Sequence, residues 1–172
     1  MKKNNYQKRL LKSIPGGAHT YSKGYDQFPS NAPEILDRGK GCYVFTTKNE
    51  KLLDYGMALR AVNIGYSENK IDNAAIKQLK KGNNLTKASL IELEAAELLI
   101  NEIDSIDMVK FTKNGSTAVS AGIKLARAYT GRDLIARCTQ HPFFSYDDWF
   151  IGNTNIRRGI PKTIQKLTKE FN

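Results

Sequence analysis

Residues 108–138 read MVKFTKNGSTAVSAGIKLARAYTGRDLIARC, and this stretch decides the fold. The apolar run at 108–112 has the length of a short strand, and residues 134–138 form a second such run. Between them the apolar residues take helical spacing up to about Tyr129, and Gly131 is placed to end the helix. Strand, helix and strand in this order predict a right-handed βαβ unit and therefore an α/β fold with a parallel sheet.

Two more helices are predicted before this unit, over residues 69–82 and 90–102. In both segments apolar residues recur at intervals of three and four. A third, short helix is predicted over residues 2–13, because Tyr6, Leu10 and Leu11 share one face. The turn-forming residues Pro15-Gly16-Gly17 would stop it.

An antiparallel meander is predicted between the helix at residues 2–13 and the helix at residues 69–82. Its strands are three short runs with β-branched or aromatic residues, separated by turn-forming segments. The runs are residues 34–38, 42–46 and 51–55.

The charge distribution argues against a nucleic-acid partner. The chain has 172 residues, with 27 Lys+Arg against 17 Asp+Glu and a net charge of +10. Most of the excess lies at the two ends, in residues 1–26 and 155–172, whereas the middle of the chain is nearly balanced. No zinc-finger, RNP or KH signature accompanies the basic ends, so solvated termini are the simpler interpretation.

Composition also sets the expected surroundings of the protein. Every apolar run is far shorter than the roughly 20 residues of a membrane-spanning helix, and no secretory leader follows the basic N-terminus. We therefore expect a cytoplasmic protein without a membrane partner. Cys42 and Cys138 fit no metal-binding spacing and are expected to be buried free thiols. The adjacent Asp147 and Asp148 would point to opposite faces of a strand, so no metal is expected.

The first candidate site is the turn Asn114-Gly115-Ser116 at the predicted start of the helix. Amides in the first helical turn lack intrahelical acceptors, and the helix dipole makes this end positive, so a phosphate would be favoured there. Gly115 would allow close approach, and the hydroxyls of Ser116 and Thr117 could donate to the ligand. Simple capping of the helix by Asn114 or Ser116 explains the same residues equally well.

The second candidate site is the aromatic segment at residues 138–150, just after the predicted second strand. Ligands of open α/β sheets bind beyond the carboxyl ends of strands, so this segment and the Gly115 turn should share one rim of the sheet. The alternative is an aromatic cluster that only covers the edge of the sheet. The glycine turn at residues 15–22 is a third candidate, either lining a substrate entrance or linking helix to meander.

Several motifs resemble the N-terminal portion of the class III, fold-type I aminotransferases that use pyridoxal 5'-phosphate (PLP), with the glutamate-1-semialdehyde 2,1-aminomutase branch most similar. The resemblance covers essentially the whole chain. The motifs are Pro15-Gly16-Gly17-Ala18-His19-Thr20, Leu36-Asp37-Arg38-Gly39-Lys40-Gly41, Leu53-Asp54-Tyr55, Lys113-Asn114-Gly115-Ser116, residues 125–133 and residues 148–152.

By this resemblance Asn114, Gly115 and Ser116 stand where the family has Ser-Gly-Thr, which holds the cofactor phosphate. Phe143 stands where the family places the aromatic ring that stacks on the pyridine, with Phe144 or His141 as alternatives for that place. The Asn-Gly-Ser variant of the motif suggests a subfamily with a different substrate.

The resemblance also implies a division of labour. Residues 1–60, with the first helix and the meander, would belong to the small domain, and residues 61–172 would begin the large PLP-binding domain. The family's Schiff-base lysine and the acidic partner of the pyridine nitrogen match no position here, so no catalytic residue is assigned. The chain alone is therefore expected to be inactive, whereas the complete enzyme would be a homodimer acting on a small amino or keto substrate.

Two other functions fit the same sequence features. The first is a sugar aminotransferase of polysaccharide biosynthesis, which would share the cofactor site. The second is a non-catalytic binding or interaction module that keeps the phosphate cradle and has lost the chemistry.

Overall fold

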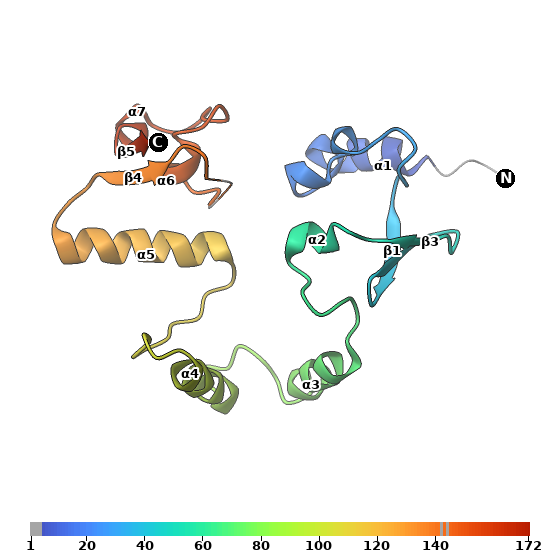
Figure 1. Cartoon of the computed structure of the whole chain (residues 1–172), viewed down its shortest axis with the longest axis horizontal. Helices are drawn as coiled ribbons and strands as arrows, with labels where there is room; N and C mark the ends of the chain where they lie inside the picture. The colour runs from blue at the N-terminus through green and yellow to red at the C-terminus, as the bar shows by residue number, and fades with distance from the viewer. Residues whose placement is uncertain (1–4, 142, 144) are drawn as a thin grey trace. The chain divides into compact units, whose positions relative to one another are not determined.

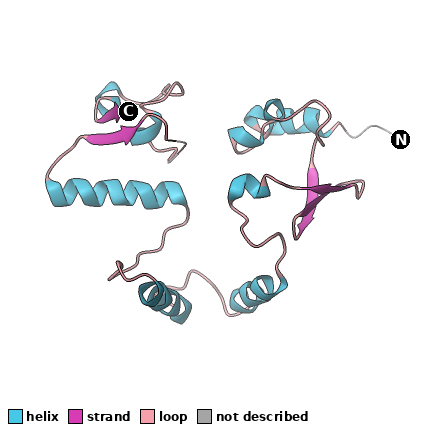
Figure 2. Ribbon diagram, in the orientation of Figure 1, coloured by secondary structure: helices cyan, strands magenta, loops and turns pink. Residues whose placement is uncertain are grey.

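The computed structural model describes residues 5–141, 143 and 145–172. The chain divides into two compact units, the first extending to Thr86 and the second beginning at Lys87. Figure 1 labels the helices and strands of both units, and Figure 2 shows the two small sheets, one in each unit.

The first unit contains the predicted meander, although its first strand lies two residues further along the chain than the predicted run at 34–38. Strands β1 (Leu36–Lys40), β2 (Tyr43–Thr46) and β3 (Lys51–Leu53) pair in that order, and both pairings are antiparallel. Two of the predicted helices are confirmed here as α1 (Tyr6–Ser13) and α3 (Asn69–Leu79). The remaining elements are short: η1 (Pro15–Gly17), η2 (Tyr21–Lys23), η3 (Tyr25–Gln27) and α2 (Met57–Arg60).

Tyr66 fastens the meander to the segment that follows it. Its backbone exchanges hydrogen bonds with Gly41 at 2.8 and 2.9 Å. Its ring lies on the backbone of Gly39, where an added Cβ would come within 2.5 Å of the Tyr66 Cγ. Gly39 is therefore required by close packing, and a larger side chain there would push the ring away. The ring ends in a hydroxyl that donates to Asp54 Oδ2 at 2.6 Å.

This hydrogen bond gives the first unit a predictable pH dependence. It lowers the pKa of Asp54 below its usual 3.8 and raises the pKa of Tyr66 above its usual 10.0. For Asp54 the stabilisation is complete above the unfolded pKa and is lost as the pH falls through the lower folded pKa. For Tyr66 it is complete below the unfolded pKa and is lost as the pH rises through the higher folded pKa.

Replacing Tyr66→Phe should therefore lower the free energy of unfolding by about 1 kcal/mol near neutral pH, with a smaller loss at both extremes. Urea titrations followed by circular dichroism at acidic, neutral and alkaline pH would measure the difference. Tyr55→Phe is the matched control, because the Tyr55 side chain is 90% exposed. A loss that is equal at all pH values would show that the ring contact, and not the hydrogen bond, carries the stabilisation.

The second unit contains the confirmed helices α4 (Leu90–Glu102) and α5 (Gly115–Thr130). Ser89 and Glu92 form a capping box at the start of α4, and Gly131, with a φ of 64°, ends α5 in the left-handed conformation. Strand β4 (Ile135–Cys138) pairs in parallel with β5 (Thr168–Phe171), in a register that runs from Ile135 opposite Thr168 to Cys138 opposite Phe171. The α/β class is confirmed.

The predicted βαβ unit is wrong in its first strand. Residues 108–112 form no strand, whereas the predicted strand at 134–138 is present as β4. The parallel neighbour of β4 is β5, and the connection between them contains the short helices α6 (Asp148–Ile151) and α7 (Lys162–Gln165). A strand needs a hydrogen-bonding neighbour, and within the described part of the chain the 108–112 run has none.

Few side chains are buried. Among the described residues the buried apolar side chains are Val44, in the meander, and Phe150, in α6. Large apolar side chains on α4 and α5 are exposed instead, including Leu90 at 69% and Leu125 at 71%. The expected burial of both thiols is wrong, since Cys42 is exposed and Cys138 is only partly buried.

Candidate functional site

The first turn of α5 is capped by Asn114. Its backbone is extended, with φ −161° and ψ 170°, and its Oδ1 accepts a hydrogen bond from the Thr117 amide at 2.9 Å. The Asn114 carbonyl accepts from the Ala118 amide at 3.1 Å. The capping interpretation of this turn is therefore confirmed for Asn114, and two of the first amides of the helix are satisfied by it.

The amides of Gly115 and Ser116 are left for another acceptor. Within the part of the chain that the structure describes, neither amide has a hydrogen-bond acceptor. A Cβ added to Gly115 would meet no atom within 4 Å, so the space beside this residue is open. Two amides at the positive end of a helix of 16 residues, beside open space, suit an anionic group of the size of a phosphate.

Ser116 also ties the helix to the aromatic segment. Its Oγ accepts a hydrogen bond from the Tyr146 amide at 3.3 Å, which leaves the hydroxyl proton able to donate elsewhere. The neighbouring Ser145 is completely buried, and its Oγ accepts from the Asp147 amide at 3.1 Å. The segment that follows β4 is therefore held against the start of α5, so the aromatic segment and the Gly115 turn lie together, as predicted from the sequence.

A second contact between the same two elements was not predicted from the sequence. Ser120 Oγ donates to Asp147 Oδ2, and it accepts from the Trp149 indole Nε1 at 3.1 Å. Ser120 lies one helical turn after Ser116, so both hydroxyls lie on the same face of α5. The spacing of two serines in a helix of small and apolar residues marks a polar strip on one face of α5, but it does not show which segment that face contacts.

The aromatic segment combines a buried ring with an exposed one. Phe150 is 4% exposed and makes edge-to-face contacts with Trp149, at a ring separation of 5.5 Å, and with Phe143, at 5.8 Å. Phe143 itself is 64% exposed, so much of its ring remains available to a ligand. An aromatic cluster at the sheet edge is thus present, and it supports Phe143 from one side.

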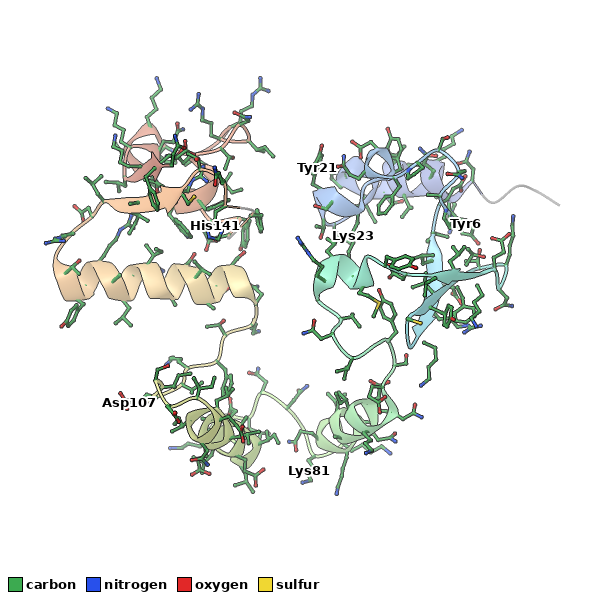
Figure 3. All side chains as sticks on the ribbon, viewed as in Figure 1. Tyr6, Tyr21, Lys23, Lys81, Asp107 and His141 are labelled. Carbon is green, nitrogen blue, oxygen red and sulfur yellow. The ribbon has the colours of Figure 1, made fainter. Side chains whose placement is uncertain are left out.

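The two alternatives to Phe143 stand differently. Phe144 lies outside the described residues. His141, labelled in Figure 3, is exposed and follows the carboxyl end of β4, with its amide donating to the Cys138 carbonyl at 3.3 Å.

The described ranges contain no group of three side chains that could ligate a metal. They also contain no helix with the length and apolar character of a membrane span.

The glycine turn at residues 15–22 lies in the first unit. Gly16 and Gly17 have φ values of 72° and 75°, in the left-handed region that glycine adopts without strain. Gly17 is among the residues that line a cavity of about 1040 Å³ in this unit, together with Leu10, Tyr25 and Phe28.

Comparison with known proteins identifies the family. The class-III aminotransferase family matches residues 22–170, which is most of the chain, so the protein belongs to this family. Glutamate-1-semialdehyde 2,1-aminomutase of Wigglesworthia glossinidia brevipalpis is 31% identical, over 98% of this chain and 42% of its own length. The 3-aminobutyryl-CoA aminotransferase of Cloacimonas acidaminovorans is also 31% identical, over 92% of this chain and 37% of its own length.

Solved structures agree on the fold. The FumI protein of Sphingopyxis sp. MTA144, in its PLP internal aldimine form, superposes with a TM-score of 0.86 at 28% identity. The match covers 97% of this chain and 39% of that protein. The chain thus spans about two fifths of the length of the relatives it matches. The fold is that of part of a fold-type I PLP transferase, as the resemblance implied.

Proposed function

We propose that this chain supplies the phosphate-binding end of a PLP site in an enzyme that transfers amino groups on small amino or keto compounds, similar to glutamate-1-semialdehyde 2,1-aminomutase. The observation that carries the proposal is the open first turn of α5, with the amides of Gly115 and Ser116 beside empty space. Family membership supports the choice of PLP over other phosphate-bearing ligands.

Four residues are proposed to hold the cofactor. The Gly115 and Ser116 amides and the Ser116 hydroxyl would donate to phosphate oxygens, and Asn114 would fix the start of the helix through its cap. Phe143, which is supported by its edge-to-face contact with Phe150, would stack on the pyridine ring. When bound, PLP supplies an electron sink for proton removal at the substrate Cα.

The contacts between Ser120, Asp147 and Trp149 have a positioning role in this proposal. They join α5 to the segment that carries Phe143, so that the phosphate donors and the ring stay on one rim. Such rigid support reduces the ordering cost of binding. None of these three residues is proposed to touch the reacting atoms.

The catalytic lysine is not among the lysines of these 172 residues in our proposal. Residues 1–60 would serve as part of the small domain and 61–172 as the beginning of the large one. The complete enzyme would be a cytoplasmic homodimer, whereas this chain alone would bind the cofactor phosphate without catalysing transfer.

The proposal is tested by titrating the full chain with PLP and with pyridoxal, which has the same ring and aldehyde but no phosphate. We expect PLP to bind at least about tenfold more tightly, because two charge-assisted hydrogen bonds are lost with the phosphate. Borohydride reduction followed by peptide mapping should leave no uniquely modified lysine. Equal affinities would refute the phosphate site, and one stoichiometrically modified lysine would refute the proposed inactivity.

A further inference from the structure

A second feature of the Lys87–Asn172 unit has no part in the proposed PLP site. It is a basic hollow of about 990 Å³ between the end of α6, the connection to α7, and the strand pair β4–β5. Nitrogen-tipped side chains project outward from the segment that contains α7 and β5 (Figure 3). The charged side chains that line the basic hollow are Arg137, Arg157, Lys162, Lys166, Lys169 and Glu170.

The single carboxylate among them is already committed. Glu170 lies opposite Arg137 in the parallel register and forms an ion pair with it. The Arg137 side chain is only 9% exposed, and its Nη2 also donates to the Asn153 carbonyl at 2.7 Å. Its guanidinium lies 5.0 Å from the Phe150 ring centre, so Arg137 is held firmly at the wall of the hollow.

The other four cations of the hollow lack a counter-charge. Across the described residues the ion pair of Arg137 with Glu170 is the one salt bridge, so Arg157 and the three lysines have no acidic partner there. Four like charges around one hollow repel one another, and this repulsion is relieved when an anion enters.

The walls of the hollow are fixed by hydrogen bonds. Asn153 Nδ2 donates to the Thr168 carbonyl at 2.7 Å and joins the end of α6 to β5. Gln165 Nε2 donates to the Ile160 carbonyl at 2.8 Å and closes the turn before α7. Thr168 is buried, with only 2% of its surface exposed, and its hydroxyl donates to the Trp149 carbonyl at 2.6 Å. These hydrogen bonds and the strand pairing connect α6, α7 and both strands, and so fix the backbone beside the cationic side chains.

We propose that the basic hollow binds a small ligand that carries a diphosphate group. A single phosphate carries about −1.5 to −2 at neutral pH and would balance only part of the four free cations. Two adjacent phosphates come closer to balance. The volume is that of a small-molecule site, and the charge gathers around one hollow instead of following a long stripe, which favours a compact ligand over a nucleic-acid strand.

The experiment is calorimetric titration of the full chain with inorganic pyrophosphate, ADP and orthophosphate at one fixed ionic strength. Pyrophosphate and ADP should bind with similar affinity, and orthophosphate about tenfold more weakly. The double variant Arg157→Gln with Lys162→Gln should raise the Kd for pyrophosphate about tenfold, since two surface cations are removed. Equal binding of orthophosphate and pyrophosphate would refute a diphosphate ligand.

Two controls distinguish binding in the hollow from general charge attraction and from binding at the start of α5. Lys110→Gln with Arg132→Gln makes the same charge change at exposed positions of the same unit that do not line the hollow, and should leave pyrophosphate binding within about twofold. If it weakens binding as much as the first pair does, the interaction is general charge attraction and the proposal fails. The Arg157→Gln with Lys162→Gln protein should keep its PLP affinity within about twofold, so failure of the proposed PLP site and failure of the basic hollow can be told apart.

Discussion

Replacing Phe150→Ala should lower the free energy of unfolding of the second unit by about 3 kcal/mol. Phe150 is the buried apolar side chain of this unit among the described residues, and it contacts the rings of Trp149 and Phe143 and the guanidinium of Arg137. Truncation would remove all three contacts and leave a cavity in a core too small to absorb it.

The chain provides its own probe for this measurement. Trp149 is the single tryptophan in the sequence, and its ring meets Phe150 edge to face. Urea unfolding followed by tryptophan fluorescence therefore reports on this unit. Tyr146→Ala is the control, because its side chain is 68% exposed and its loss should change the free energy of unfolding by no more than about 0.5 kcal/mol. If both variants unfold at the wild-type urea concentration, Phe150 is not the centre of a core.

Replacing Gly115→Val should weaken PLP binding about a hundredfold, provided that the first turn of α5 holds the phosphate. The new side chain would occupy the open space beside Gly115 and keep a phosphate away from two amides, each able to contribute about 1.5 kcal/mol or more to an anion. Since an added Cβ meets no protein atom there, the fold should not be disturbed.

Gly122→Val is the matched control for this prediction. Gly122 lies in the same helix, and a Cβ added to it also meets no atom within 4 Å. The two variants introduce the same side chain into α5, but only Gly115 adjoins the free amides. PLP affinity measured by absorbance should fall for Gly115→Val, and further when Ser116→Ala is added, but not for Gly122→Val. A Gly115→Val protein that binds PLP normally would reduce the turn to a helix cap.

Local patterns were sufficient to predict the four longer helices and the meander, whereas the short helices α2, α6 and α7 were not predicted. The apolar spacing in residues 90–102 matches α4 to the residue, and Gly131 ends α5 as its type suggests. The run at 108–112 failed because strand propensity reports a preference of the backbone, whereas a strand exists only where another strand lies beside it. Likewise, β5 was not predicted, because its parallel pairing with β4 joins residues 33 positions apart.

The candidate site was predictable in part for the same reason. The helix start and its cap are local, so Asn114 and Gly115 could be singled out from the turn itself. Contacts of Ser116 and Ser120 with Tyr146, Asp147 and Trp149 join residues 27 to 30 positions apart, and no local pattern encodes them. The basic hollow was recognised only as a charged terminus, because the sequence does not show that α7 and β5 present those charges around one space.

The exposed leucines and isoleucines of α4 have one more consequence. Leu90, Ile91, Leu93 and Leu98 are all about half exposed or more, and at 100° per residue they point to more than one side of the helix. The apolar side chains of such a helix are buried only when other protein surfaces cover the helix on more than one side. We therefore expect this chain to self-associate, so that its sedimentation coefficient falls on dilution. Denaturation midpoints should be compared only at matched protein concentration.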